Sequence, residues 1–391
     1  MIRRCPATPE DYRALARRRL PRFLFDYVDG GAGREQTLLS NVRDWSGICL
    51  RQRVMIDVDG IDTKTRLAGQ DCRQPLVLAP IGMAGMTARR GEVQAVRAAD
   101  AAGVPFTLST VGLCGIDEVA AAAAAPVWFQ LYMIRDRGIV EALLDKAWQS
   151  GCQTLVFTVD LPMPGSRHRD ARNGIGLPGL RPKVLKIGQV LSRPGWLWNV
   201  AVRGKPLSFG SMSAHVPAAS DPDAFKRWVD EQFDPTMTWA DIAWLRQRWQ
   251  GRLLLKGILD RDDALKAVDA GADGIVVSNH GGRQLDGVSS TASVLPAIAA
   301  AVGERTEILV DGGLRSGIDV FRALCLGASG VMIGRPWVWA LAGAGQAGIE
   351  RTLAIFRDEL RIAMALTGVT RIADIGPDCL VNDPRAASER N

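Results

Sequence analysis

The clearest chemical signal in this sequence is a histidine three residues ahead of an arginine, in the segment SNHGGRQLDG that begins at Ser278. Histidine accepts a proton near neutral pH, and the planar guanidinium of arginine holds a carboxylate through two parallel hydrogen bonds. Because the chain has only three histidines, candidates for a general base are few. His280 and Arg283 therefore indicate proton abstraction from a small carboxylic acid. The alternative is a loop histidine that caps backbone groups beside an arginine in solvent.

Single charged residues also stand within or at the end of two apolar runs. Asp160 ends the run TLVFTVD, where a carboxylate can orient an imidazole and stabilise its protonated form; a helix N-cap is the alternative role. Lys256 lies inside LLLKG, and lysine is seldom buried without an anionic partner. The alternative for Lys256 is a side chain that extends from the strand end to solvent.

Two further loops combine glycine with arginine. Asp311 begins the segment DGGLR, which ends at Arg315, and Gly334 and Arg335 lie in the segment IGRP. Backbone N–H groups and guanidinium groups together can bind a phosphate, and barrel enzymes commonly hold one after their last two strands. The two loops therefore predict a phosphate site.

These residues must be positioned by strands, and eight short apolar runs predict them. Helical patterns separate the runs, which is typical of buried parallel strands. The runs are 75–80, 104–109, 127–132, 154–160, 253–257, 274–279, 308–312 and 330–334. Their alternation with helices favours an α/β fold of the (β/α)8 TIM barrel type over an open doubly wound sheet. Chemistry in such barrels lies at the carboxyl ends of the strands, where the polar residues above fall.

We expect a single domain over residues 1–391. Residues 1–70 form an N-terminal extension with a helix from Thr8 to Tyr27, residues 75–345 form the barrel, and residues 346–391 form a C-terminal helix and tail. About ninety residues separate the fourth strand from the fifth, so we expect a long inserted loop, residues 171–220.

The inserted loop is basic. No Asp or Glu occurs between Asp170 and Asp221, while seven Lys or Arg do, against a net charge of +6 for the whole chain. The rest of the chain is close to neutral, so no nucleic-acid partner is expected.

Composition limits the remaining classes of protein. With 47% hydrophobic and 23% charged residues and a mean hydropathy of +0.03, the chain is typical of globular proteins and not of disordered ones. It has no apolar run long enough to span a membrane, and its arginine-rich start lacks the apolar stretch of a secretion signal. The seven cysteines are scattered without CxxC spacing, so we expect no metal site, no disulfide framework and a cytoplasmic location.

Longer segments of the chain resemble the FMN-dependent α-hydroxy acid dehydrogenases and oxidases. SNHGGRQLDG is close to a signature of that family, and FDYVDGGA, LAPIGM, TLST, WFQLY, FTVDLPMPGSRHRD, LLLKGILD, LVDGGLRSG and IGRP follow in the family's order over nearly the whole chain. Within the family, the segments from the third and fourth strands are most similar to the respiratory L-lactate dehydrogenases.

The resemblance implies a role for each candidate residue. His280 takes a proton from the substrate as two electrons pass to FMN, Asp160 orients it, and Tyr132 bonds the substrate hydroxyl or the developing carbonyl. The substrate carboxylate is bound by Tyr27, Arg167 and Arg283. Lys256 lies beside the flavin and stabilises its anionic reduced form. The other FMN-binding residues are Ala79, Pro80, Ile81, Ser109, Gln130, Thr158, Ser278, Asp311, Gly312, Gly313, Arg315, Gly334 and Arg335.

Two positions depart from family patterns. Val111 stands where glycolate oxidase has a tryptophan, so the substrate wall is smaller there. Gly82 stands where several members carry alanine, close to the expected flavin face.

The resemblance also implies partners. The loop 171–220 contains Trp196 and Trp198 among basic residues, a composition suited to anionic lipid headgroups. We therefore expect peripheral binding to the cytoplasmic side of the inner membrane, electron delivery to a quinone or another respiratory acceptor, and a homotetramer. A basic lid over the active site is the alternative role of the loop. Alternative activities are a soluble oxidase that makes hydrogen peroxide, a mandelate dehydrogenase, a barrel that binds a phosphorylated metabolite without redox chemistry, and a membrane scaffold without catalysis.

Overall fold

Eight parallel strands form one barrel, which confirms the predicted (β/α)8 fold. The computed structural model describes residues 5–177, 179–204, 207, 210–212 and 231–381. The barrel strands pair in the order β3-β10-β9-β8-β7-β6-β5-β4, and a parallel bridge between Leu78 and Phe106 joins the two end strands. They are β3 (Leu76–Leu78), β4 (Thr107–Ser109), β5 (Trp128–Tyr132), β6 (Thr154–Thr158), β7 (Arg252–Ile258), β8 (Gly274–Val277), β9 (Glu307–Val310) and β10 (Gly330–Ile333).

Helices connect these strands and surround the barrel. Local sequence fixes several of their ends: Asp136, for example, is an N-cap whose carboxylate accepts hydrogen bonds from the backbone N–H groups of Gly138 and Ile139. The connecting helices are α4 (Gly91–Ala102), α5 (Ile116–Ala122), α6 (Arg137–Gln149), α12 (Arg261–Asp269), α13 (Thr291–Val302), α14 (Gly317–Cys325) and α15 (Arg335–Ala344), with short 3₁₀ turn η1 (Ala84–Met86) ahead of α4.

The N-terminal extension is built from helices α1 (Pro9–Arg19), α2 (Arg22–Asp29) and α3 (Gln36–Ser46). The prediction of a single helix from Thr8 to Tyr27 is therefore wrong, because the chain breaks between α1 and α2. Pro21 lacks a backbone N–H and disfavours helical geometry in the residue before it, so Leu20 is extended, with φ −80° and ψ 147°. The break turns α2 toward the barrel mouth.

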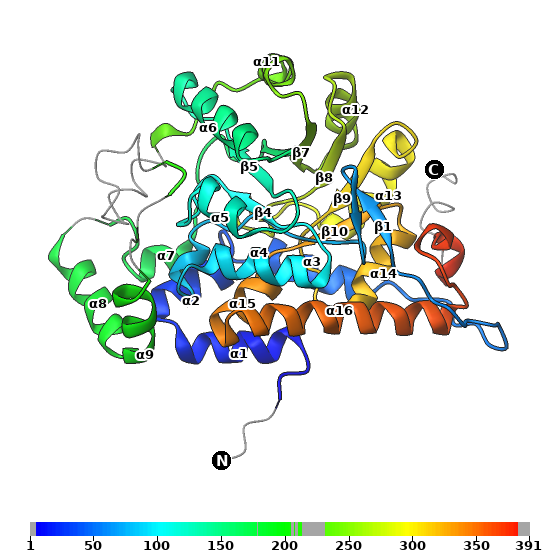
Figure 1. Cartoon of the computed structure of the whole chain (residues 1–391), viewed down its shortest axis with the longest axis horizontal. Helices are drawn as coiled ribbons and strands as arrows, with labels where there is room; N and C mark the ends of the chain where they lie inside the picture. Colours follow the sequence, from blue (N-terminus) through cyan, green and yellow to red (C-terminus); the bar gives the residue numbers. More distant parts are fainter. Residues whose placement is uncertain (1–4, 178, 205–206, 208–209, 213–230, 382–391) are drawn as a thin grey trace.

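The C-terminal helix α16 (Gln346–Thr367) packs on α4, α14 and α15, and α1 packs on α15. Figure 1 shows α1, α15 and α16 together on one side of the barrel. Two short turns, η3 (Ile372–Asp374) and η4 (Pro377–Cys379), follow α16.

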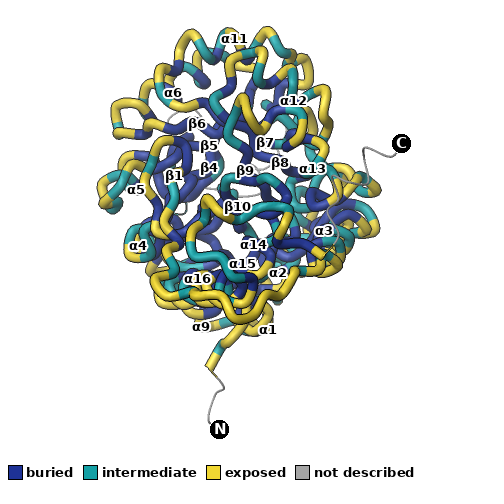
Figure 2. Tube along the Cα trace, turned by 90° about the vertical axis from the view of Figure 1, so that its right-hand side faces the viewer, coloured by how far each residue is buried: buried dark blue, intermediate teal, exposed yellow. Residues whose placement is uncertain are grey.

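A hairpin that the sequence did not reveal closes the barrel at the end where its strands begin. Its strands β1 (Thr65–Leu67) and β2 (Gln70–Cys72) are antiparallel. Leu67 and Ala68 pack among inward-facing strand residues. Figure 2 shows the barrel strands coloured as buried. The barrel residues in this cluster are Val77, Trp128, Val156, Leu254, Val276, Leu309 and Met332. Ligands therefore reach the barrel from the carboxyl ends of its strands.

The inserted segment after β6 is largely helical where the structure describes it, and is not an open loop. It forms α7 (His168–Arg172), α8 (Leu180–Leu191), α9 (Pro194–Trp196), the π-helix η2 (Leu197–Val202) and, before β7, α11 (Trp239–Arg248). Residues 213–220 of the predicted segment lie outside the described residues. Figure 1 shows α8 and α9 at one edge of the molecule, next to α1 and α2.

The two tryptophans of the predicted loop 171–220 differ in environment. Trp196 is buried and its indole N–H donates to the Met86 carbonyl at 2.7 Å, whereas Trp198 is 60% exposed. Trp196 therefore holds the segment to the η1 turn, and of the two only Trp198 is exposed. In the described part of the chain, no helix combines the length and apolar character needed to cross a membrane.

Candidate active site

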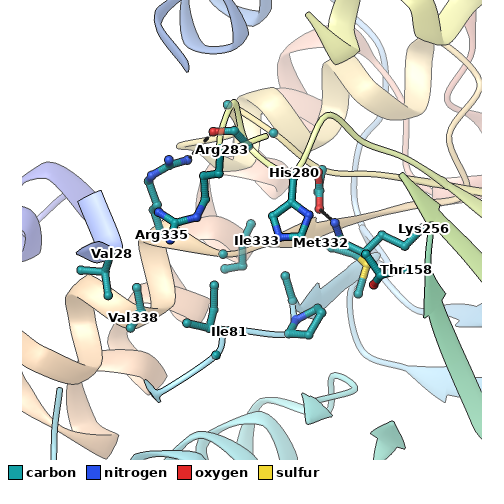
Figure 3. A pocket seen from close by; sticks show the side chains of 18 of the residues that line it. Val28, Ile81, Thr158, Lys256, His280, Arg283, Met332, Ile333, Arg335 and Val338 are labelled. Carbon is teal, nitrogen blue, oxygen red and sulfur yellow. Dashed lines mark hydrogen bonds and ion pairs between the residues drawn. The ribbon is translucent and has the colours of Figure 1, made fainter. Parts of the chain in front are cut away.

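A pocket opens at the carboxyl ends of the barrel strands and encloses about 980 Å³ between atoms, its open mouth included. The predicted site residues that line it are Tyr27, Ala79, Pro80, Ile81, Tyr132, Thr158, Arg167, Lys256, His280, Arg283, Asp311, Gly312, Gly313, Arg315, Gly334 and Arg335. Figure 3 shows Lys256 and Thr158 at one end of the pocket, Arg335 with Val28 and Val338 at the other, and His280 between them.

Four predicted residues are not part of that lining but support it. Asp160 bonds His280, and Ser278 accepts a hydrogen bond from Lys256. Ser109 Oγ donates to Gln130 Oε1 at 3.0 Å, and both side chains are buried. The structure thus brings the predicted residues to one place.

The candidate base is a largely buried histidine paired with a carboxylate. His280 Nδ1 lies 2.8 Å from Asp160 Oδ1. Burial opposes ionisation of Asp160, but His280 and Lys256 outweigh it and hold the pKa of Asp160 below its ordinary 3.8. Asp160 is therefore a carboxylate that accepts the Nδ1 proton, which leaves Nε2 as the basic ring nitrogen.

Burial also sets the protonation state of the imidazole. It lowers the pKa of His280 below its ordinary 6.5, and the charge of Asp160 offsets this effect only in part. At neutral pH His280 is therefore uncharged, which is the form that accepts a proton.

The backbone of the SNHGG loop aims this side chain. His280 has φ +56°, a left-handed conformation that non-glycine residues rarely adopt, and Gly281 and Gly282 continue it at +63° and +71°. A Cβ on Gly282 would lie 2.6 Å from the backbone nitrogen of Leu38. The two glycines therefore permit a sharp turn against the N-terminal extension, with His280 at its start.

Lys256 is a buried cation with fixed partners. Its Nζ lies 2.9 Å from Asp311 Oδ2 and donates to Ser278 Oγ at 2.9 Å. Burial favours the neutral amine, but Asp311 and Asp160 outweigh it, so the pKa of Lys256 is raised. The pocket therefore carries a permanent positive charge at this end.

Two arginines and two tyrosines line the pocket where the sequence predicts a carboxylate to bind. The guanidinium carbons of Arg283 and Arg167 lie 5.1 and 5.9 Å from the ring centre of Tyr27. Arg283 is held by the carbonyls of Tyr27 and Gly30, to which Nη1 donates at 2.7 and 2.9 Å. Burial, and then the charge of Arg167, lower the pKa of Arg283 to about 10. The Arg283 guanidinium stays charged at neutral pH, so this end of the pocket favours an anion.

Tyr132 completes that wall as a hydrogen-bond donor. Burial raises its pKa, and the nearby charge of Asp160 raises it further. The hydroxyl therefore keeps its proton, and its ring packs edge to face on Phe233 with centroids 5.4 Å apart.

The glycine loops after β9 and β10 also meet in the pocket. Gly312 and Gly313 have φ of +90° and +92°, which exposes backbone groups as the predicted phosphate site requires. Arg315 is partly buried, with its guanidinium carbon 5.0 Å from the Trp339 ring centre. Arg335 donates to the carbonyls of Asp29, Gly281 and Gly30 at 3.1, 2.9 and 2.8 Å. Arg335 therefore supplies positive charge to the site, and its described hydrogen bonds all go to backbone carbonyls.

Buried polar atoms without partners test whether FMN fits this pocket. Among the described residues, Gln130 Nε2, Thr158 Oγ1 and Asp311 Oδ1 are buried and lack a hydrogen-bond partner. Such groups cost free energy unless something bonds them. A flavin ring offers donors and acceptors along its pyrimidine edge, Lys256 offers charge there, and the glycine loops offer N–H groups for a phosphate. The residues present therefore fit FMN.

Sequence reasoning missed the ion pairs behind this wall. Asp29 is buried and accepts hydrogen bonds from Arg13 at 2.6 and 2.8 Å and from Arg169 at 2.9 Å. Arg169 also pairs with Glu35. The only sequence signal was the position of Asp29 directly ahead of two glycines; its partners come from α1 and the inserted segment, which no local pattern connects.

The two departures from family patterns lie side by side. A Cβ on Gly82 would lie 2.7 Å from Val111 Cγ2, and both residues line the pocket with Leu161. No group of three or more metal-ligating side chains occurs among the residues that the structure describes.

Comparison with known proteins places this geometry in one family. Residues 16–382 match the family described as FMN-dependent dehydrogenase. An L-lactate dehydrogenase of Stenotrophomonas maltophilia (strain R551-3) is 52% identical over 96% of this chain and 98% of its own, and one of Caulobacter vibrioides (strain NA1000 / CB15N) has the same identity and coverage. Among solved structures, the monotopic membrane protein (S)-mandelate dehydrogenase is 32% identical with a TM-score of 0.90, covering 97% of this chain and 100% of that one. A mandelate oxidase is 36% identical with a TM-score of 0.81, covering 96% and 98%.

Replacing Thr158 with valine tests whether the unpartnered hydroxyl binds the flavin. We expect FMN affinity of the flavin-free protein to fall about 2- to 10-fold, the worth of one hydrogen bond, while its free energy of unfolding does not fall. FMN titration and urea unfolding measure the two quantities. Thr107 supplies the control, since its hydroxyl is also buried and unpartnered but does not line the pocket: Thr107→Val should leave FMN affinity unchanged. Equal FMN affinity in both variants would contradict the assignment.

Proposed function

Because the chain belongs to the FMN-dependent dehydrogenase family, we propose that it oxidises L-lactate to pyruvate and passes the electrons through FMN to a membrane quinone or another respiratory acceptor. One observation carries the proposal: a neutral, Asp160-paired His280 lies in the same pocket as two charged arginines. The identity of 52% to L-lactate dehydrogenases over 96% of the chain supports the substrate.

In the proposed reaction the substrate carboxylate lies with Arg283 and Arg167, and Tyr27 and Tyr132 donate hydrogen bonds to the substrate. Bidentate guanidinium contacts fix the orientation of a small acid, which brings its reacting carbon to the base. When bound, FMN accepts the two electrons that leave the substrate.

His280 takes one substrate proton at Nε2 in this scheme. The proton converts a neutral ring into an imidazolium that lies 2.8 Å from the Asp160 carboxylate, so the new charge is stabilised where it forms. The same groups serve whether the proton comes from the α-carbon or from the hydroxyl. Burial keeps water from competing for the base.

The proposed FMN site consists of the unpartnered polar groups, Lys256 and the glycine loops of the pocket. Gln130, Thr158 and Lys256 would bond the pyrimidine edge of the ring, with Ser109 and Ser278 beside them, and the backbone of Ala79, Pro80 and Ile81 would meet its face. The residues for the ribityl chain and phosphate are Asp311, Gly312, Gly313, Arg315, Gly334 and Arg335.

Mandelate is a second candidate substrate, because the (S)-mandelate dehydrogenase fold superimposes with a TM-score of 0.90. The small side chains of Gly82 and Val111 leave room on that wall. We propose lactate as the substrate because the L-lactate dehydrogenase relatives are 52% identical to this chain, whereas the mandelate dehydrogenase is 32% identical.

The outer face of α8 supports peripheral contact with the cytoplasmic side of the inner membrane. The helix buries none of its side chains, contains Arg181, Lys183 and Lys186, and has no acidic residue. Four apolar residues of α8 are spaced by four, three and four positions, so they share one face of the helix. They are Leu180 (77% exposed), Val184 (57%), Ile187 (57%) and Leu191 (65%), and the exposed residues Trp198 and Val202 follow them in the chain. An apolar face flanked by cations is typical of helices that lie in the membrane interface.

A homotetramer is the proposed assembly. An apolar patch lies away from α8, where the backbone N–H of Arg53 donates to the carbonyl of Leu366 at 2.9 Å. Its exposed members are Val54, Met55, Ile56, Ile362 and Leu366. Grouped apolar exposure of this kind is typical of protein interfaces.

An anaerobic absorbance spectrum before and after L-lactate tests the activity. We expect the visible flavin band to bleach on addition of L-lactate and to recover quickly with a quinone but slowly with air. Fast recovery in air with release of peroxide would indicate an oxidase, and bleaching by mandelate alone would move the substrate. A preparation supplied with FMN that shows no flavin band would refute the central proposal.

The pH dependence of catalysis tests the paired base. kcat/KM should rise with pH through the pKa of His280, which lies below 6.5. Asp160→Asn removes the charge that raises this pKa, so the acid limb should move to lower pH. The plateau should fall roughly 10²- to 10⁴-fold because the imidazolium loses its partner. An acid limb at higher pH, or an unchanged plateau, would show that Asp160 does not act through His280.

Replacing apolar residues on the outer face of α8 with negatively charged ones should release the protein from membranes. In the double variant Val184→Asp and Ile187→Asp, vesicle binding should weaken by more than about 100-fold, since each apolar side chain contributes about 1.5–3 kcal/mol when buried. Co-sedimentation with vesicles measures it. Leu39→Asp is the control, because Leu39 is 64% exposed on α3. Retained binding of the double variant would exclude α8 as the contact.

A further inference from the structure

A second cavity, which encloses about 1190 Å³ between atoms with its open mouth included, lies between helix ends and the inserted segment. One wall is the end of α1, a second is the end of α15, and a third is the turn from α8 through α9 into η2. Its polar lining includes Thr87, Gln94, Ser192 and Asn199. We refer to it as the arginine cavity, because Arg18, Arg19 and Arg193 line it.

The charge of this cavity is one-sided. Its lining contains three arginines and no Asp or Glu. Among the described residues no carboxylate pairs with Arg18 or Arg19. Arg193 donates from Nε to the Leu20 carbonyl at 3.2 Å and from Nη1 to its neighbour Ser192. These contacts fix the Arg193 side chain against the end of α1, and no carboxylate of the described residues compensates its charge.

Helix dipoles do not cancel that charge. The carboxyl ends of α1 and α15 both lie at the cavity, and each is equivalent to about half a negative charge. The three full positive charges exceed this sum, so the cavity favours an anion. The exposed carbonyls at the two ends can accept hydrogen bonds from hydroxyl or amino groups that the same ligand carries.

The cavity borders the apolar face proposed to meet the membrane. Leu191, 65% exposed, precedes the lining residue Ser192, and Trp198, 60% exposed, precedes the lining residue Asn199. Trp196 lies between them with its indole fixed to the Met86 carbonyl. An anion in the cavity would therefore have apolar side chains at its edge.

From this juxtaposition we propose that the arginine cavity binds the phosphate-bearing headgroup of an anionic phospholipid, whose acyl chains lie along the exposed face of α8 and η2. The inference rests on the proposed membrane contact and adds a defined headgroup site to it. Charge complementarity selects the ligand: three cations converge on a cavity that no described carboxylate neutralises, and guanidinium groups bind phosphate oxygens in pairs.

The test compares vesicles of phosphatidylcholine with vesicles that also contain phosphatidylglycerol, using the FMN-loaded full-length protein. The measured quantity is the ratio of binding to the anionic and the neutral vesicles. Arg18→Gln, Arg19→Gln and Arg193→Gln should each reduce this ratio by more than about tenfold, as expected for hydrogen bonds to a charged group. Arg17→Gln is the matched control, because Arg17 is exposed on the same turn of α1 but does not line the cavity. It should lower the ratio by no more than about fivefold, the effect of one charge near a membrane surface.

A second pair of variants fills the cavity without changing charge. Ala344 is exposed and lines the cavity, whereas Ala347 is exposed and does not. Ala344→Trp should reduce the ratio about as much as Arg19→Gln, and Ala347→Trp should leave it unchanged. Inorganic phosphate at constant ionic strength should not release the wild-type protein from anionic vesicles.

Each other result overturns the proposal in an identifiable way. Equal losses in the four arginine variants would mean that charge acts diffusely and not in a cavity. Release by inorganic phosphate would assign the cavity to a soluble phosphate compound. If the wild type binds neither kind of vesicle, the membrane contact itself fails together with this site. If the Val184→Asp and Ile187→Asp variant is released while Ala344→Trp binds like the wild type, the contact stands and the headgroup site is refuted.

Discussion

Burying charge without leaving it unpaired is the constraint on which this structure depends. The pocket and the groups that support it hold the buried or half-buried charges of Lys256, Asp311, Asp160, Arg283 and Arg335. Removing an ion from water costs several kcal/mol unless a partner replaces the lost hydration. Lys256 meets Asp311 at 2.9 Å, and Asp160 meets His280 at 2.8 Å. Asp311 keeps Lys256 positive, whereas burial keeps His280 neutral although Asp160 raises its pKa. One small space thus holds both groups in the state that the proposed chemistry requires.

The arginines are compensated differently, and this explains the N-terminal extension. Arg283 and Arg335 are both held by backbone carbonyls of residues 27–30. Those carbonyls are available because α2 ends at Asp29, where the last carbonyls of a helix lack intrahelical partners. Asp29 is itself fixed by Arg13 and Arg169. The extension is thus part of the site, and the break at Pro21 is what directs it there.

The inserted segment joins this site to the surface proposed to meet the membrane. Its inner side is polar and fixed: Arg169 pairs with Asp29 and Glu35, and Gln189 accepts a hydrogen bond from the Phe23 N–H at 2.7 Å. Its outer side carries the apolar row of α8. Helix α15 lines both the active-site pocket, through Val338, and the arginine cavity, through Leu341 and Ala342. A lipid headgroup held there would set the distance between the bilayer surface and the flavin pocket.

The sequence by itself determined the barrel, because its eight apolar runs and their spacing are local properties that a buried parallel strand requires. It also indicated most of the pocket: polar residues such as Lys256, His280 and Asp311 follow apolar runs, and closing a barrel brings all strand ends to one mouth. Tertiary structure alone decided the rest. The Asp29 ion pairs have no local pattern, since Arg13 and Arg169 lie far from Asp29 in the chain. The β1–β2 hairpin pairs locally, but its place beneath the barrel depends on contacts with distant strands. Trp196 and Trp198 are two residues apart in one basic segment, and only packing against the Met86 carbonyl turned one inward and left the other exposed.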